Sequence, residues 1–197
     1  MKPMAQVRDA ATMRALSHPA RYAVLEHLLL GNTATATELA EVSGLSPSAT
    51  SYHLRELAKV NLIEEAPSRG DGRERVWRTP IRGFDIEAGP NASDEERAAE
   101  RDVTEMFLDL EESWTHDWLE RRGEESQEWY QAAAMSAMRL VVTADELRKL
   151  NDDIYALLLK YGLSVRQDRP EGARQVRVTY RAFPAGLDLS ARPAQGG

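Results

Sequence analysis

The sequence has 197 residues, of which 42% are hydrophobic and 29% charged, values that suit one or two ordinary globular domains. It has no cysteine, which excludes disulfides, thiolate catalysis and thiolate metal sites. It also lacks a run of about 18 apolar residues, so no membrane span is predicted. The net charge is −7, yet residues 1–83 hold 11 Lys and Arg against 9 Asp and Glu, whereas residues 84–197 hold 14 against 23. Only the N-terminal part is therefore suited to face a polyanion.

Three helices are expected before residue 44. The first spans residues 5–16, and the second starts near Pro19, at a position where helices tolerate proline. A short third helix starts at Thr35 or Thr37, and Thr35 with Glu38 three residues later fits a capping box. The extreme N-terminus lacks the apolar core of a signal peptide, so a cytoplasmic protein is expected.

Residues 45–60 predict a helix suited to a DNA groove. Ser46 can cap its start, and Pro47 takes the first helical position. Gly44 supplies a tight turn before it, which makes a helix-turn-helix, and an apolar stripe from Thr50 to Val60 faces inward. Small polar residues allow close approach to bases and phosphates. The candidate DNA contacts are Ser46, Ser48, Ala49, Ser51, Tyr52, His53 and Arg55. For His53 the pattern leaves two roles open, a donor to DNA or a cap on the core.

The next segment predicts a β-hairpin, or wing. A strand starts at Leu62, a glycine-containing turn cluster covers residues 68–73, and a second strand covers residues 73–79. Trp77 is expected to anchor the hairpin to the core. Arginines at a hairpin tip suit phosphate contact or minor-groove insertion, although a solvated charged hairpin is the alternative. The three tip arginines are Arg69, Arg73 and Arg75.

Four short motifs follow one another in a familiar order. They are Leu16-Ser-His-Pro-Ala-Arg, Thr37-Glu-Leu-Ala, Leu45-Ser-Pro-Ser-Ala-Thr-Ser-Tyr-His-Leu-Arg-Glu-Leu and Asn61-Leu-Ile. With them, residues 8–82 resemble the ArsR/SmtB family of bacterial winged-helix repressors, and the Ser-His-Pro-x-Arg opening sets them apart from MarR-like winged helices. The resemblance implies a dimeric repressor that binds a pseudo-palindromic operator and leaves it when an effector arrives. It does not extend to the C-terminal half.

A long helix of about 29 residues is expected after a linker over residues 83–92. Ser93 and Glu96 form a capping box at its start. Its apolar residues recur every three or four positions, and such a seam on so long a helix is expected to pack on a partner subunit. In the resembled family, a helix after the wing commonly makes the dimer. The seam consists of Val103, Phe107, Leu110, Trp114 and Trp118.

The C-terminal pattern predicts a small strand-helix-strand unit. Residues 138–142 read as a strand, Thr143 with Glu146 caps a helix that runs to about Tyr161, and residues 176–183 alternate as a second strand. Two strands alone make a poor sheet, so a symmetry mate is expected to extend it. The whole is a mainly α fold with small β parts (α+β). Its domains are a winged helix over 1–82, a linker over 83–92, a dimerisation and candidate effector domain over 93–183, and a flexible tail over 184–197.

Neither a catalytic motif nor a cofactor motif occurs, so no enzyme activity and no cofactor are expected. His116 with Glu120 has metal-ligand spacing on one helix, but no second histidine follows and no metal site is predicted. An aromatic group could wall a small-molecule effector pocket or form dimer core, and the dimer core is favoured because aromatics dominate interfaces. The group consists of Trp114, Trp118, Trp129 and Tyr130, with His116 beside it.

The sequence thus predicts a homodimeric regulator that binds double-stranded DNA, acts as a repressor and responds to a non-thiolate signal. The alternative is a winged-helix module that binds proteins without specific DNA recognition. DNA binding that weakens steeply with salt would separate the two, because phosphate contacts release counterions.

Overall fold

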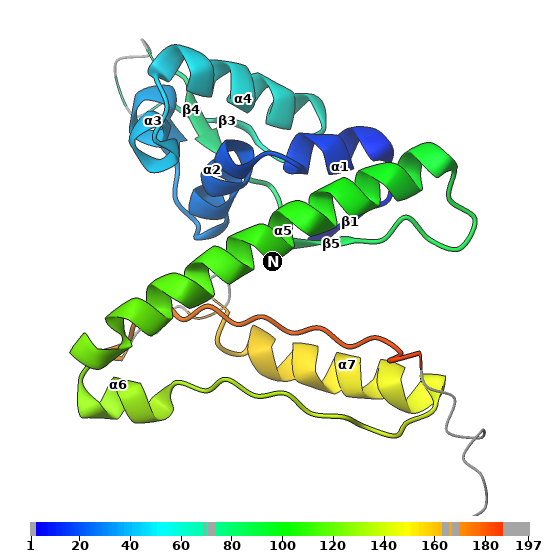
Figure 1. Ribbon diagram of the computed structural model, residues 1–197. Coiled ribbons are helices and arrows are strands. Elements are labelled where there is room, and N and C mark those ends of the chain that lie inside the picture. Colours follow the sequence, from blue (N-terminus) through cyan, green and yellow to red (C-terminus); the bar gives the residue numbers. More distant parts are fainter. Residues whose placement is uncertain (1–2, 69, 71–73, 163–165, 167–169, 187–197) are drawn as a thin grey trace, which may run out of the picture.

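A computed structural model describes residues 3–68, 70, 74–162, 166 and 170–186. The helices are α1 (Ala10–Leu16), α2 (Pro19–Leu29), α3 (Ala36–Ser43), α4 (Pro47–Lys59), α5 (Asp94–Arg121), α6 (Gln127–Ala132) and α7 (Ala144–Leu159), with a 3-10 turn, η1 (Arg122–Glu124). The strands are β1 (Met4–Val7), β2 (Ala34–Thr35), β3 (Glu64–Ala66), β4 (Val76–Arg78) and β5 (Gly83–Ile86). An N-terminal body of α1–α4 with β2, β3 and β4 lies on one side of the long helix α5, and α6 and α7 lie on the other, with the β1–β5 pair beside α5 on the side that faces α7 (Figure 1).

The predicted capping boxes are confirmed, and each fixes where a helix begins. The Thr35 hydroxyl accepts from the Glu38 N–H at 3.2 Å, while the Glu38 carboxylate accepts from the Thr35 N–H at 2.7 Å. The same reciprocal pairs start α5 at Ser93 and α7 at Thr143. Each box satisfies two backbone donors that a helix start otherwise leaves unpaired.

The predicted wing hairpin is present as β3 and β4, and a third strand that was not predicted completes its sheet. The order is β2-β4-β3, with both pairs antiparallel, and Trp77 lies opposite Ala34 on one side and Glu65 on the other. Trp77 is buried, which confirms its expected role as the anchor of the hairpin. The hairpin is thereby fixed to the segment that leads into α3.

The expected helix over residues 5–16 is wrong in its first half, where β1 pairs in parallel with β5. Val7 is buried in that position, and Asp9 then starts α1 by accepting from the Thr12 N–H at 2.8 Å. Part of the expected linker over residues 83–92 is consequently strand. Gly83 lies opposite Met4, and a Cβ at Gly83 would lie 3.0 Å from the Met4 sulfur, so the flexible Met4 side chain would have to shift slightly.

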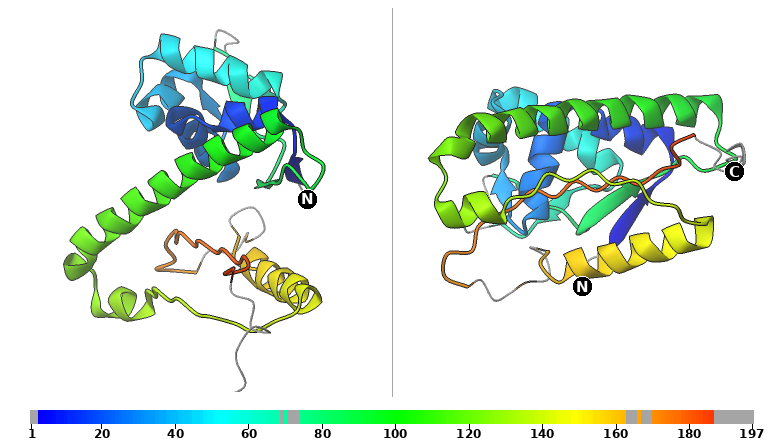
Figure 2. Two further views of the ribbon diagram at one scale, coloured as in Figure 1. Left: turned by 45° about the vertical axis from the view of Figure 1, so that its right-hand side comes forward. Right: turned by 60° about the horizontal axis from the view of Figure 1, so that its bottom comes forward.

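The hydrophobic core lies in the N-terminal body and the first half of α5. Met13, Leu16, Leu25 and Leu57 are fully buried, and α5 closes the core by packing on α1. Val103 is the last described residue of the chain that is buried. The second half of α5 therefore extends beyond the core that holds its first half (Figure 2).

The predicted strands over residues 138–142 and 176–183 are not formed, so the expected strand-helix-strand unit is wrong in its β part. No described strand lies beside either segment to complete a ladder. The helix between them, α7, is present, but its apolar side chains stay half-buried or exposed, with Leu157 54% exposed. Most of the predicted tail, residues 187–197, lies outside the described residues. In the described part of the chain, no helix combines the length and hydropathy needed to cross a membrane.

Candidate nucleic-acid interface

The turn between α3 and α4 is fixed by short-range polar contacts. Gly44 ends α3 at φ 68°, a left-handed conformation that glycine adopts without strain. Ser46 caps α4 by accepting from the Ala49 N–H at 3.3 Å. Thr50 is fully buried, and its hydroxyl donates to the Ser46 carbonyl at 3.0 Å. The predicted helix-turn-helix is therefore present with α4 held at a defined angle to α3.

Most candidate DNA contacts lie along the outward side of α4. Tyr52 is 51% exposed, and Ser48 and Arg55 are also exposed. Ala49 and Ser51 are half-buried, with the Ser51 hydroxyl donating to the Pro47 carbonyl at 2.8 Å. No carboxylate interrupts this side before Glu56, so its first two turns present hydroxyls, an aromatic ring and a guanidinium to solvent.

His53 is the exception among these candidates, because its side chain turns inward. It is only 8% exposed, and its ring centroid lies 4.5 Å from that of His18 and 5.4 Å from that of Tyr52. Its Nδ1 is buried without a hydrogen-bond partner among the described residues. Of the two roles left open by the sequence, the position of His53 fits the cap on the core and removes it from the exposed side of α4.

Arg21 of α2 ties this helix to the end of α1, a role that helix spacing gave no reason to expect. Its guanidinium donates to the carbonyl oxygens of Arg14 at 2.7 Å and of Ala15 at the end of α1. Burial lowers the pKa of Arg21, and the cation lies close enough to His18 and His53 to disfavour their protonation. The only sequence signal was its place in the Ser-His-Pro-Ala-Arg motif.

Acidification is expected to destabilise the fold through the two packed histidines. Burial, followed by the neighbouring Arg21, holds the pKa of His18 below its usual value of 6.5, and the pKa of His53 is lowered by burial, His18 and Arg21, against the smaller raising effect of Glu56. The unfolded chain therefore binds protons more readily, so the free energy of unfolding should decrease as the pH falls below about 6.5.

Urea unfolding of the wild type and of His53→Gln at pH 7.5, 6.5 and 5.5 measures this effect. The His53→Gln chain should lose less stability on acidification than the wild type, because one of the two sites is gone. His116→Gln, at an exposed position of α5, is the matched control and should follow the wild type. Equal pH dependence in all three chains would contradict the assignment.

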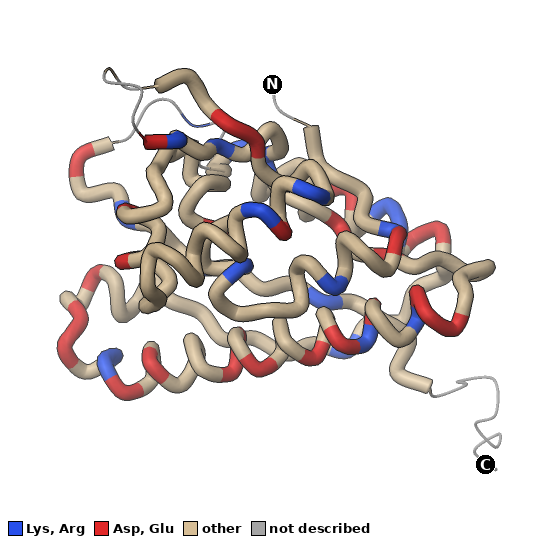
Figure 3. The backbone as a smooth tube through the Cα atoms, turned by 90° about the horizontal axis from the view of Figure 1, so that it is seen from above, with Lys and Arg blue, Asp and Glu red and all other residues tan. Residues whose placement is uncertain are grey.

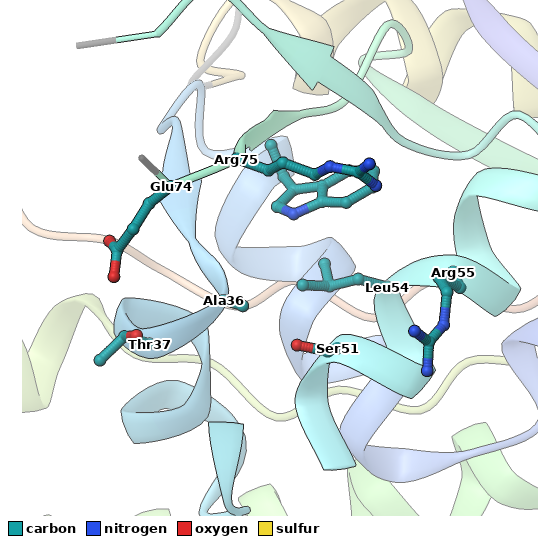
Figure 4. Close-up of a pocket in the computed structure, with 8 residues that line it drawn as sticks. Ala36, Thr37, Ser51, Leu54, Arg55, Glu74 and Arg75 are labelled. Carbon is teal, nitrogen blue, oxygen red and sulfur yellow. The ribbon is translucent and has the colours of Figure 1, made fainter. Parts of the chain in front are cut away.

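A groove runs between α4 and the hairpin. Its first part is an open hollow of about 270 Å³ between the start of α3, α4 and the hairpin, lined among others by Thr37, Ser51 and Arg55 (Figure 4). A second, wider hollow of about 440 Å³ adjoins it, and Arg55, Arg75 and Trp77 line both. Thr37 was not among the predicted contacts, although its place in the first turn of α3 turns its hydroxyl toward this groove.

The wing arginines are only partly placed. Arg75 is exposed, and its Nη1 lies 3.3 Å from the Glu65 carboxylate. Arg69 and Arg73 lie outside the described residues, so their predicted phosphate contacts stay predictions. Arg78 of β4 pairs with Glu64 of β3, with the Arg78 Nη2 2.8 Å from the Glu64 carboxylate. Exposed pairs of this kind contribute little to stability and can exchange partners readily.

The aromatic group of the C-terminal half is not gathered into one pocket. The Arg177 guanidinium lies 3.4 Å from the ring centroid of Trp114, which also neighbours Tyr22, and Arg174 lies 4.8 Å from that of Trp129. Tyr130 stacks instead with Arg122 at 4.4 Å, Trp118 is half-buried, and the exposed His116 lies 3.8 Å from Glu112. Cation–π pairs therefore separate these rings. Within the described ranges, no cluster of three or more His, Asp or Glu side chains is placed to hold a metal ion.

The long helix α5 and the groove beside α4 differ in charge. Acidic residues occur along the length of α5, whose red positions run along one edge of the molecule (Figure 3). The wider hollow of the groove beside α4 is lined by Arg55, Lys59 and Arg75 and by Glu64 and Glu65, an excess of one positive charge. A polyanion would therefore approach α4 and the hairpin and be repelled by α5.

Comparison with known proteins supports the helix-turn-helix. A family model described as a helix-turn-helix domain matches residues 16–66. The HTH-type transcriptional regulator YgaV of Escherichia coli (strain K12) is 42% identical over 55 residues, 28% of this chain. Those residues span 56% of that regulator, about half of its length.

Solved structures give weaker likenesses. The homodimeric winged helix-turn-helix DNA-binding domain of Mb0332 from Mycobacterium bovis, a possible ArsR-family regulator, has a TM-score of 0.33 and 19% identity over 54% of this chain and 82% of that one. A MarR family transcriptional regulator from Silicibacter pomeroyi has a TM-score of 0.31 and 14% identity over 72% of this chain and 69% of that one. Both TM-scores are too low, and too alike, to separate the two families.

Proposed function

We propose that this protein is a sequence-specific DNA-binding transcriptional regulator whose α4 enters the major groove. The observation that carries the proposal is the exposed side of α4, which is free of acids over two turns and is flanked by the groove that Arg55 and Arg75 line. A helix with small polar residues at its start can reach base edges, while arginines beside it hold phosphates. The helix-turn-helix match over residues 16–66 supports this proposal.

The regulator acts as a homodimeric, cytoplasmic repressor on a pseudo-palindromic operator, as the resemblance to the ArsR/SmtB family implies. Two copies would place two α4 helices in successive major grooves, about 34 Å apart, so the operator should contain two half-sites with that spacing. The signal that releases the protein acts through residues 93–183, without a thiolate and without a catalytic step.

A gel-shift titration over a salt series tests the proposal. A specific complex with fragments selected from genomic DNA should weaken steeply as salt rises. Six to ten phosphate contacts would reduce the affinity by about 10³–10⁵ between 50 and 200 mM salt. Unrelated competitor DNA of equal length provides the control for specificity. Failure to select any fragment would contradict the proposal and favour a winged-helix module that binds proteins.

A further inference from the structure

The chain after Val103 carries many large apolar side chains that the structure leaves uncovered. No described residue beyond Val103 is buried. Met138 and Val141 are each 82% exposed, and Val176 and Val178 are 66% and 62% exposed. A monomeric protein seldom exposes so many large apolar side chains in one half of its chain, and surfaces rich in them commonly mark interfaces.

Two extended segments carry most of these side chains. Residues 134–142 and 174–183 form no backbone hydrogen bonds with the described part of the chain. They run lengthwise near α7, one above and one below it in Figure 1, and neither forms a described strand pair with the other. Their backbone N–H and C=O groups therefore present two open edges, which another extended segment can complete.

Side chains on both faces hold the second segment to the rest of the chain. Arg177 forms a two-point ion pair with Glu26 of α2, with the closer contact at 2.6 Å, and Arg181 pairs with Glu111 of α5. Side chains alternate in an extended segment, so Val176 and Val178 lie on the other face. On that face, Arg174 pairs with Glu125, and the Tyr180 hydroxyl donates to Asn151 of α7. The backbone N–H and C=O groups between the two faces form no hydrogen bonds with the residues that the structure describes, so this edge can pair with another strand.

We propose that residues 134–142 and 174–183 are strands of an intermolecular β-sheet that forms with a second copy of this chain. Each copy brings two strands and one amphipathic helix, α7. Two strands are too few for a stable sheet, whereas four strands covered by two helices have an ordinary size. The inference rests on the homodimer of the proposed function and names the surface that joins it.

Two observations favour a second copy as the occupant. Residues 187–197 have only Leu187 and Leu189 as large apolar side chains, too few to cover both segments. The two segments contain four arginines and no acid, and three of these arginines already pair with acids of the same chain, Arg174 with Glu125, Arg177 with Glu26 and Arg181 with Glu111. Arg139 is exposed and has no acidic partner among the described residues, and the acidic helices of a second copy would supply one.

The lack of cysteine allows a direct test with single cysteines in the full chain. Val141→Cys and Val178→Cys are treated with a short bis-maleimide, separately and mixed, and Asn32→Cys, at an exposed position of the N-terminal body, is the control. At least one of the three Val samples should give covalent dimer in excess over the control. Dimer by sedimentation without such cross-linking would overturn the proposal, and so would a monomeric wild type.

A double substitution tests the same surface by charge. The double variant Val141→Lys with Val178→Lys should sediment as a monomer and keep the helical circular dichroism of the wild type. The control is Val42→Lys, at an exposed position of α3, which should leave the dimer intact. Should the double variant not fold, the cysteine variants decide. A gel shift in parallel separates the two proposals: cross-linked dimer without operator binding supports the shared sheet and contradicts the proposed function. Operator binding by a dimer that the lysines do not disturb overturns the sheet alone.

Discussion

Replacing Arg55 with alanine is expected to reduce discrimination between the operator and single-base variants by about 1–3 kcal/mol, roughly fivefold to more than a hundredfold. Arg55 is exposed on α4 and lines both hollows of the groove beside the hairpin. A guanidinium there can bind the two acceptors of a guanine at once, which alanine cannot replace. Competition gel shifts with the selected operator and its single-base variants measure the loss.

Lys59→Ala is the control for Arg55→Ala, because Lys59 lies one turn further along α4 and pairs with Glu56 at 2.6 Å. Its loss should weaken binding to all sequences alike, with a smaller salt dependence, as expected of a phosphate contact. If Arg55→Ala has that same uniform effect, Arg55 contacts phosphate and another residue reads the bases. Unchanged binding by Arg55→Ala would contradict the placement of α4 in the groove.

Replacing Leu57 with alanine is expected to lower the free energy of unfolding by about 2–5 kcal/mol, a large fraction of the stability of a small domain. Leu57 is fully buried on the inward side of α4, where it joins the core formed with α1 and α2. The substitution leaves a cavity that its close-packed neighbours fill only in part. Urea denaturation followed by circular dichroism measures the change.

Leu119→Ala makes the same chemical change on another helix, at a position that is 44% exposed, and should alter stability by about 0.5 kcal/mol or less. A comparable loss at both positions would show that helix propensity, and not the core, decides the effect. Because Leu57 fixes the inward side of α4, its loss should also weaken DNA binding at temperatures where the variant begins to unfold.

The N-terminal body was largely predictable because its signals are local. Thr35, Ser46 and Ser93 cap helices through contacts within three residues, and Gly44 fixes a turn by its own backbone freedom. The candidate contacts on α4 follow from helix spacing in the same way. His53 could not be assigned, because its burial depends on His18, a residue of another helix.

Pairings between distant segments were the part that the sequence did not predict. Residues 4–7 alternate weakly enough to fit a helix or a strand, and only β5, about 80 residues later, decides for the strand. The reverse happened over residues 138–142 and 176–183, where alternation predicted strands that have no partner in the single chain. Trp114 was grouped with its helix neighbours, whereas its closest cation comes from Arg177.

The ion pair between Arg177 and Glu26 joins the C-terminal half to α2. The segment that carries Arg177 starts near the end of α5, where Arg174 pairs with Glu125, and Arg177 then reaches α2 while it stacks on Trp114 of α5. Trp114 still neighbours Tyr22 of α2, so α5 extends only about 10 Å beyond that contact to Arg121, at 1.5 Å per residue. A second contact, from the Tyr155 hydroxyl of α7 to the Asp85 carboxylate of β5 at 3.2 Å, joins the two halves at another place. Both exposed contacts therefore have to open before the C-terminal half can move relative to α4.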